Sequence, residues 1–171
     1  MERPAYLILD TLKKLGVNYI VTLPDNWLKE LLVLADADSD LVHIPISREE
    51  EGVGICAGLY MAGKESALII QNSGLFLSCN AIKSLGSKYR IPIFILLSNR
   101  GGIGETADYH IVGGKGLTTR PLLDTLDVPS VEVNTPAELS KIADAYRFCR
   151  ISEQPVAVIL GKEALVGPEQ A

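Results

Sequence analysis

The sequence predicts an α/β fold in which helices cover both faces of a mainly parallel sheet, giving a doubly wound domain of three layers. Short runs rich in Val and Ile alternate along the chain with segments whose apolar residues recur at helical spacing, as expected when crossover helices join buried parallel strands. The 171 residues are 47% hydrophobic and 22% charged, with no repeat, low-complexity tract or change of composition. We therefore expect a single domain over residues 1–171.

Six segments have the apolar spacing of an amphipathic helix. The first is Pro4–Leu15, where proline is tolerated in the first turn and Gly16 provides a stop. The second opens at Pro24 and Asp25 and ends in a polar turn at residues 36–40. The other four helices are expected at residues 48–62, 75–85, 117–126 and 136–150.

Short apolar runs are expected to form the strands, at residues 19–23, 41–46, 67–71, 91–98, 130–133 and 156–160. The run 91–98 is the most apolar, so we expect it in the centre of the sheet, buried on both faces. The run 41–46 contains Pro45, which cannot donate a ladder hydrogen bond. That strand is therefore expected at an edge of the sheet, or to end at the proline.

Two segments are expected to lie outside the regular elements. Residues 99–115 contain several glycines and no helical period, which predicts a loop too long to be a simple connector. Loops of this length in compact α/β domains are usually functional or mobile. The tail after Gly161 is short, and its last residues are expected to be disordered.

The charge of the chain argues against a nucleic-acid-binding protein. The formal net charge is −5 and the pI is near 5.1, and the basic residues are scattered along the sequence rather than clustered. No window approaches the ~20 uninterrupted apolar residues of a membrane span, and the first residues do not resemble a secretory leader. We therefore expect a cytoplasmic protein that binds neither nucleic acid nor a membrane.

The three cysteines, Cys56, Cys79 and Cys149, are far apart in the sequence. This spacing matches neither a CxxC metal-binding pattern nor an even set of disulfides. We expect buried free thiols and no metal site formed by this chain.

The first candidate site is the helix start at residues 48–60. Glutamates occupy positions 49–51, and carboxylates at a helix N-terminus have a simple structural explanation, because they complement the helix dipole. The dipole does not explain the small residues that follow, since each glycine costs ~1 kcal/mol relative to alanine in a helix. Their presence suggests that another backbone or a ligand comes close. These small residues are Gly52, Gly54, Ala57 and Gly58.

Two further segments carry candidate residues. Residues 71–80 follow a predicted strand and open a helix, so their amides could hold a polar ligand, although Asn72 or Ser73 could simply cap the helix. The predicted loop 99–115 contains His110, a reasonable proton donor or substrate contact near neutral pH. The other histidine, His43, lies in a predicted strand and is expected to be structural.

Several of these residues together resemble the pyrimidine-binding domain of thiamine-diphosphate-dependent decarboxylases. Glu49 is followed nine residues later by Gly58, with Val-Gly-Ile-Cys-Ala-Gly leading into Tyr60 and Ala-Gly-Lys at residues 62–64. In this register the family's glutamate matches Glu49 rather than Glu50 or Glu51. The resemblance implies that this carboxylate binds N1′ of the cofactor's pyrimidine and promotes the 4′-imino form, which removes the thiazolium C2 proton.

The resemblance also implies roles for other residues. Asn72, Ser73, Gly74 and Asn80 match a cofactor-side segment, although Phe76 stands where the family often has a further glycine. His110 matches a histidine of the sulfopyruvate and phosphonopyruvate decarboxylases. Candidate substrate contacts are the cations Arg100 and Arg48, although either could equally be a surface or salt-bridge residue. Asp25 is a further candidate, which lies where related decarboxylases have an acidic residue but lacks the expected neighbouring glycine.

The likeness covers nearly the whole chain and is closest to sulfopyruvate decarboxylase alpha subunits, with phosphonopyruvate decarboxylases second. The family holds the cofactor's diphosphate through Mg²⁺ in a separate domain marked by Gly-Asp-Gly, which this sequence lacks. The resemblance therefore implies a beta subunit that carries this domain and its Mg²⁺, with thiamine diphosphate at the interface and Gly52, Gly54 and Ala57 in a close-packed seam. The implied reaction, a step of coenzyme M biosynthesis, converts the anionic 2-oxoacid 3-sulfopyruvate to sulfoacetaldehyde and CO2.

Other interpretations remain open at the level of the sequence. A phosphonopyruvate decarboxylase subunit would require the same positive charge as one acting on the sulfonate. A non-catalytic flavodoxin-like binding domain would share the alternation, but it gives no reason for Glu49 and the small residues after it, and the chain has no GxGxxG or P-loop motif. A regulatory or degenerate partner with the thiamine fold is disfavoured by Glu49, whereas Phe76 and the turn at residues 24–26 leave room for it.

Overall fold

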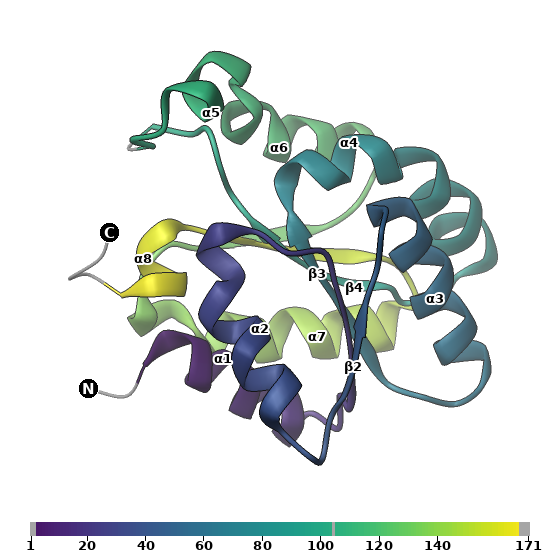
Figure 1. Cartoon of the computed structure of the whole chain (residues 1–171). Coiled ribbons are helices and arrows are strands. Elements are labelled where there is room, and N and C mark those ends of the chain that lie inside the picture. Colours follow the sequence, from purple (N-terminus) through teal and green to yellow (C-terminus); the bar gives the residue numbers. More distant parts are fainter. Residues whose placement is uncertain (1–2, 104, 168–171) are drawn as a thin grey trace.

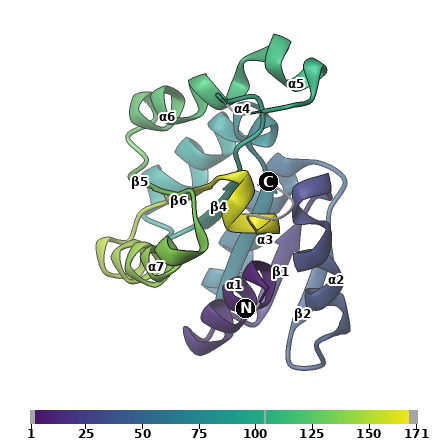
Figure 2. The same cartoon turned by 90° about the vertical axis from the view of Figure 1, so that its left-hand side faces the viewer.

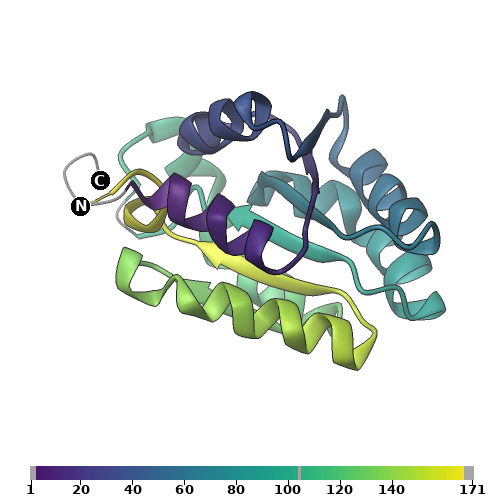
Figure 3. The ribbon, with the colours of Figure 1, turned by 90° about the horizontal axis from the view of Figure 1, so that it is seen from below.

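The computed structural model describes residues 3–103 and 105–167. Its centre is a six-stranded sheet with the strand order β2-β1-β3-β4-β6-β5. All neighbouring strands are parallel. Helices α3, α4 and α6 cover one face of the sheet, and α1, α2, α7 and α8 cover the other (Figures 1 and 3). The predicted doubly wound α/β class is confirmed, and the described sheet is parallel throughout.

The strands are β1 (Tyr19–Thr22), β2 (Val42–Pro45), β3 (Ser66–Gln71), β4 (Phe94–Ser98), β5 (Ser130–Val133) and β6 (Val156–Leu160). The main helices are α1 (Pro4–Lys14), α2 (Lys29–Ala37), α3 (Glu49–Met61), α4 (Asn72–Ala81), α5 (Asp108–Gly113), α6 (Lys115–Thr125), α7 (Ser140–Ser152) and α8 (Lys162–Val166). Single turns of 3-10 helix precede α2 and α7, as η1 (Asn26–Leu28) and η3 (Pro136–Glu138), and a π-helical segment, η2 (Ile82–Ser87), extends α4.

Alternating side chains of the strands separate two cores. One face of the sheet packs against α1, α2, α7 and α8 through residues such as Ile69 and Leu96, and the opposite face packs against α3, α4 and α6 through Ile70 and Leu97. Every residue of β4 is buried, as predicted for the central strand. β2 is an edge strand that ends at Pro45, which also confirms the prediction.

The observed elements differ from the predicted ones in several places. The predicted loop 99–115 contains the helix α5, which buries none of its side chains and therefore shows no amphipathic pattern. α4 starts at Asn72, three residues earlier than predicted, and α8 lies in the predicted tail. β4 starts at Phe94 rather than Ile91, because Pro92 has no N–H for the ladder. The prediction that the last residues are disordered concerns residues outside the described ranges.

Two smaller predictions concern the cysteines and His43. All three thiols are free, and Cys56 and Cys149 are buried as expected, whereas Cys79 is partly exposed. Burial raises the pKa of Cys56 and of Cys149 to about 12, so both stay protonated at neutral pH. His43 bridges Thr22 and Asp36 through its two ring nitrogens, consistent with a structural role.

Among the described residues, no helix is long and apolar enough to cross a membrane.

Candidate active site

The candidate residues gather at one edge of the sheet. Because all the strands are parallel, the residues that follow each strand meet at the carboxyl edge, which faces the viewer in Figure 2 together with α5 and α8. The pairing of Gln71 with Ser98, for example, places the segments that follow β3 and β4 side by side. Asp25, Glu49, Asn72 and Arg100 all lie in segments that begin at this edge.

Glu49 is the first residue of α3, and only 8% of its surface is exposed. Its side chain lies directly against Gly74 in the first turn of α4: a Cβ added to Gly74 would be 2.2 Å from Cγ of Glu49 and 2.7 Å from its Oε1. The structure thus brings together Glu49 and the Ser73–Gly74 segment, which the sequence had suggested separately. A glycine is needed at position 74 because the carboxylate occupies the space of a side chain.

The carboxylate of Glu49 forms no hydrogen bond or ion pair with any residue in 3–103 or 105–167. Its neighbours differ. Glu50 pairs with Arg48 at 2.9 Å, and Glu51 accepts a hydrogen bond from the backbone N–H of Ser47. The N-terminal dipole of α3 favours a negative charge at Glu49, but a nearly buried carboxylate is normally matched by a hydrogen-bond donor. Of the three glutamates at positions 49–51, Glu49 is therefore the one whose carboxylate is available to bind a group from outside the described chain.

The small residues of α3 face in two directions, which corrects the predicted seam. A Cβ on Gly52 would be 2.5 Å from Cδ1 of Leu68 and 2.7 Å from Cδ1 of Ile46, and Ala57 is buried, so Gly52 and Ala57 pack against the sheet. Gly54 and Gly58 have no atom within 4 Å of an added Cβ. Of the three residues expected in the seam, only Gly54 lies on the open side of the helix, where Gly58 accompanies it.

Asn72 is fully buried and links three segments through its side-chain amide. Its Nδ2 donates to Oδ1 of Asn99 at 3.2 Å, to the carbonyl of Arg100 at 2.8 Å and to Oγ1 of Thr119 at 2.9 Å, while its Oδ1 accepts from the N–H of Arg100 at 3.2 Å. Asn72 and Ser73 are helical residues, and Gln71 stands at the N-cap without a side-chain bond, so the simple capping alternative is wrong. The amide of Asn72 instead holds the segment after β4 against α6.

Asn72→Ala is expected to lower the free energy of unfolding by about 2–3 kcal/mol, because it removes the buried hydrogen bonds to Asn99, Arg100 and Thr119, including the one to the carbonyl of Arg100. Asn80→Ala is the matched control, since Asn80 is exposed on α4 and, in the part of the chain that the structure describes, its side chain hydrogen-bonds the hydroxyl of Ser84 alone, at 3.3 Å. It is expected to change stability by no more than about 0.5 kcal/mol. Chemical denaturation of both variants measures the difference, and equal effects would contradict the bridging role of Asn72.

Arg100 forms a buried cluster with two carboxylates. Its Nη1 lies 3.2 Å from Oδ1 of Asp25 and its Nε 2.7 Å from Oε2 of Glu105, and the three side chains are only 5%, 5% and 2% exposed. The guanidinium also stacks over the ring of Trp27, with Cζ 4.2 Å from the ring centroid. Ser98 donates its hydroxyl hydrogen to Asp25 at 2.9 Å. The charge of Arg100 is therefore matched inside the chain, in keeping with the salt-bridge alternative for this residue.

The cluster shifts the pKa values of Arg100 and Glu105. Burial disfavours the charged form of Arg100, but the hydrogen bond to Glu105 and the charge of Asp25 outweigh it and raise the pKa of Arg100. Burial would likewise raise the pKa of Glu105, but hydrogen bonds from Arg100 and from three backbone N–H groups lower it to about 2. Sequence reasoning missed Glu105. The only signal was a carboxylate five residues after an arginine in the same glycine-rich segment.

His110 lies on α5, with its ring 4.3 Å from the ring of Tyr109 between centroids. Burial and, next, the positive charge of Arg100 lower the pKa of His110, so the imidazole is neutral at pH 7. Two further residues that were predicted for the site, Arg48 and Asn80, are more exposed than His110. Arg48 lies at the surface in its ion pair with Glu50, and Asn80 faces outward from α4.

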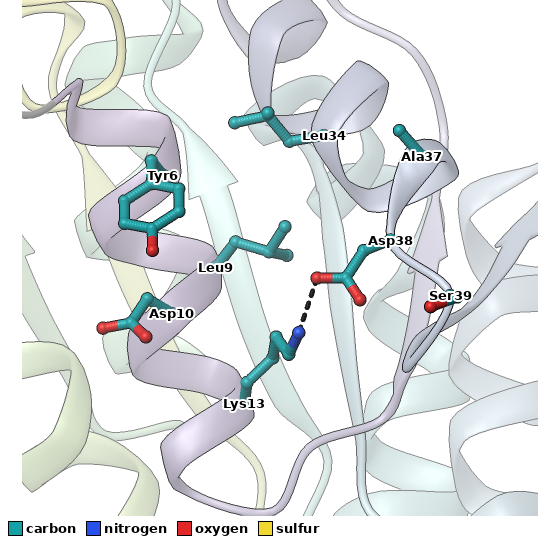
Figure 4. A pocket seen from close by; sticks show the side chains of 8 residues that line it. All are labelled: Tyr6, Leu9, Asp10, Lys13, Leu34, Ala37, Asp38 and Ser39. Carbon is teal, nitrogen blue, oxygen red and sulfur yellow. Dashed lines mark hydrogen bonds and ion pairs between the residues drawn. The ribbon is translucent and has the colours of Figure 1, made fainter.

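Two clefts lie on different parts of the molecule. One of about 540 Å³ lies at the carboxyl edge and is lined by Trp27, Asn99, Glu105 and Lys162 among others. Another of about 400 Å³ lies between α1 and α2, where Lys13 pairs with Asp38 at 2.6 Å (Figure 4). The helices α1 and α2 cover the face of the sheet opposite α3 and α4, so this second cleft is separate from the candidate residues.

Comparison with known proteins connects this arrangement with a family. No family model matches the sequence. The chain is 42% identical over 146 residues to "Sulfopyruvate decarboxylase subunit alpha" of Methanococcus maripaludis, covering 85% of this chain and 86% of that protein. It is 39% identical over 160 residues to the protein of the same name from Methanocaldococcus jannaschii, covering 92% of each. It is also 35% identical over 138 residues to "Sulfopyruvate decarboxylase" of Methanosarcina acetivorans, covering 75% of this chain but 35% of that longer protein.

A solved structure supports the fold. The crystal structure of benzoylformate decarboxylase from Polynucleobacter necessarius matches 97% of this chain and 31% of its own, with a TM-score of 0.70 at 18% sequence identity. Similarity at this level of identity concerns the fold, whereas the relatives at 39–42% identity match over nearly their whole length. The chain belongs to the family of sulfopyruvate decarboxylase alpha subunits.

Proposed function

We propose that this chain is the alpha subunit of a thiamine-diphosphate-dependent enzyme that decarboxylates 3-sulfopyruvate to sulfoacetaldehyde and CO2. The observation that carries the proposal is the carboxylate of Glu49, which is nearly buried, confined by Gly74 and without a partner among the described residues. The substrate is suggested by the names of the relatives at 39–42% identity. The predicted location in the cytoplasm stays a prediction.

The chemistry of Glu49 fits the pyrimidine ring of thiamine diphosphate. When bound, this cofactor supplies the carbanion and the electron sink that decarboxylation of a 2-oxoacid requires. Glu49 would accept a hydrogen bond from the protonated ring nitrogen N1′ and thereby hold that proton in place. The N–H groups of Ser73 and Gly74 lie in the first turn of α4, where they have no acceptor within the helix, and they could serve the polar atoms of the same ligand.

The cofactor's diphosphate is expected to be held by another subunit. No group of three or more His, Cys, Asp or Glu side chains that could hold a metal occurs in residues 3–103 and 105–167. Relatives of about the same length are named as alpha subunits, and this chain matches only 35% of the Methanosarcina acetivorans protein. Both observations support a separate beta subunit that holds Mg²⁺ and the diphosphate. Gly54 and Gly58 would allow this subunit to approach α3 closely.

The substrate side of the site is proposed to include His110 as a proton donor or acceptor. Its lowered pKa keeps the imidazole neutral at pH 7, and a neutral imidazole can both donate and accept a hydrogen bond. Arg100 is matched by Asp25 and Glu105, so this trio carries a net negative charge. We expect the sulfonate of the substrate to meet a cation outside the trio.

The proposal is tested by mixing this chain with its candidate beta subunit, thiamine diphosphate and Mg²⁺. Decarboxylation of 3-sulfopyruvate is measured beside 3-phosphonopyruvate and pyruvate, with each subunit alone as a control. We expect activity only in the mixture and the highest kcat/KM with 3-sulfopyruvate. Preference for 3-phosphonopyruvate would transfer the assignment to that substrate, activity of this chain alone would refute the need for a partner, and inactivity on all three acids would refute the proposed function.

A further inference from the structure

The carboxylate of Glu105 is the centre of a hydrogen-bond network that folds the segment after β4. Its Oε2 accepts from Nε of Arg100 at 2.7 Å and from the N–H of Gly101 at 3.3 Å. Its Oε1 accepts from the N–H of Thr106 at 2.9 Å, from the N–H of Ala107 at 3.1 Å and, more weakly, from Nη2 of Arg100 at 3.5 Å. One side chain that is 2% exposed thus holds both ends of the segment 100–107.

This network matters because α5 has little else to hold it in place. None of the side chains of α5 is buried, and the helix projects beyond the layers of the domain (Figures 1 and 2). Ala107, whose N–H donates to Glu105, is the N-cap residue of α5. Within the helix, a Cβ added to Gly101 would lie 2.4 Å from the carbonyl oxygen of His110. The backbone of α5 therefore packs closely against Gly101, whose N–H donates to Glu105.

A second close approach joins the same segment to α6. A Cβ on Gly116 would lie 2.3 Å from the backbone N of Gly102. Gly101 has a φ of +80°, which favours glycine and allows the chain to turn tightly here. Residues 101–102 therefore contact the backbone of α5 at His110 and of α6 at Gly116, and Gly101 is held in turn by the carboxylate of Glu105.

We propose that Glu105 is a positioning residue of the decarboxylase: it fixes residues 100–101 and 106–107 and the backbone of α5, and thereby places His110 at the carboxyl edge of the sheet. This inference rests on the proposed function of the site. In this proposal Arg100 belongs to the same hydrogen-bond network. It is the cation that holds Glu105 in place, not a ligand of the substrate.

The chemistry of the network requires a carboxylate rather than an amide. The two oxygens together offer about four acceptor positions, which match the four shorter hydrogen bonds, and the longer contact from Nη2 of Arg100 at 3.5 Å shares one of them. A glutamine of the same shape has one acceptor oxygen, and its NH2 group would face backbone or guanidinium donors. The lowered pKa of Glu105 is consistent with a carboxylate that remains ionised over the whole range in which a decarboxylase works. Glu105→Gln is thus a nearly isosteric test of the network.

The structural part of the proposal is tested by amide hydrogen exchange on the folded full-length chain. Glu105→Gln is expected to speed exchange by about tenfold or more at Gly101, or else at Thr106 and Ala107, because NH2 replaces the oxygen that accepts from one of these two sets. Glu132→Gln is the matched control, since Glu132 lies at the surface on β5 and, among the described residues, its carboxylate pairs with Arg120 alone, at 3.5 Å. Unchanged exchange at all three amides in Glu105→Gln would overturn the proposal. Should Glu105→Gln fail to fold, Glu105→Asp, which keeps the charge but shortens the reach, provides the same readout.

The functional part is tested by a double-mutant cycle in the enzyme reconstituted with its beta subunit. If Glu105 acts through His110, Glu105→Gln lowers kcat by about tenfold or more, and adding it to His110→Gln lowers kcat by no more than about twofold further. Effects that multiply would overturn the positioning role, because they would mean that Glu105 acts independently of His110. An inactive wild-type mixture would refute the proposed function itself, whereas the exchange experiment decides separately whether Glu105 holds the segment.

Discussion

Glu49→Gln is expected to lower kcat of the reconstituted enzyme by ~10²-fold or more while leaving the chain folded. Glutamine preserves the shape of the side chain, but it cannot hold a proton at a ring nitrogen as a carboxylate does. Stability should be unchanged or slightly higher, because the carboxylate forms no hydrogen bond or ion pair within the described chain whose loss would matter. The measurements are the decarboxylation rate and the thermal unfolding midpoint.

Glu50→Gln is the control for this variant. Its carboxylate lies one residue away in the same helix turn but pairs at the surface with Arg48. Surface ion pairs contribute little to stability, so both activity and unfolding should stay close to wild type. Full activity of Glu49→Gln would remove the assignment of Glu49, and a comparable loss in Glu50→Gln would show that the net charge of the helix start, rather than Glu49, is what matters.

Gly74→Ala is expected to lower kcat of the reconstituted enzyme by a factor on the order of 10², because the new methyl group needs the space of the Glu49 side chain. The added Cβ would lie 2.2 Å from Cγ of Glu49 and 2.7 Å from Cδ and Oε1. The side chain of Glu49 must move, and a displacement of about 1 Å at a reacting group is enough for a loss of this size. The measurement is the decarboxylation rate at saturating substrate.

Gly54→Ala separates this steric effect from the general consequences of replacing a helical glycine. An added Cβ at Gly54 meets no atom within 4 Å, so the isolated chain should be more stable by up to about 1 kcal/mol. Unfolding of both variants of the isolated chain shows whether the loss in Gly74→Ala is a loss of folding or of geometry. A folded Gly74→Ala chain with wild-type kcat would show that the position of Glu49 is not restricted by Gly74.

The predictions that succeeded rest on patterns that are local in the sequence. The alternation of Val- and Ile-rich runs with helical periods arises from the side-chain spacing of strands and helices, and it predicted the parallel sheet and its central strand, β4. Pro45 predicted an edge strand because a missing N–H has the same consequence in any fold. The choice of Glu49 among three glutamates rests on the resemblance to a family and stays a prediction, and the structure adds that its carboxylate has no partner in the described chain.

The predictions that failed depend on which way a side chain points. α3 carries small residues on both of its sides, so the sequence could not tell that Gly52 and Ala57 face the sheet while Gly54 and Gly58 face outward. α5 was predicted as loop because a helix without buried side chains has no apolar period. In both cases the deciding information lies in the neighbouring elements, not in the segment itself.

The sequence by itself determined the α/β class and the order of most elements, because periodicity is a property of short segments. Only the tertiary structure decided which hydrogen-bond and ion-pair partners the polar side chains of the site have. Asp25 and Arg100 are 75 residues apart in the sequence, and Asn72 is 28 residues from Arg100 and 47 from Thr119. Only the parallel sheet, which brings the carboxyl ends of its strands to one edge, places these groups within hydrogen-bonding distance. That geometry determines that Arg100 is bound by Asp25 and Glu105, while Glu49 is left without a partner in the described chain.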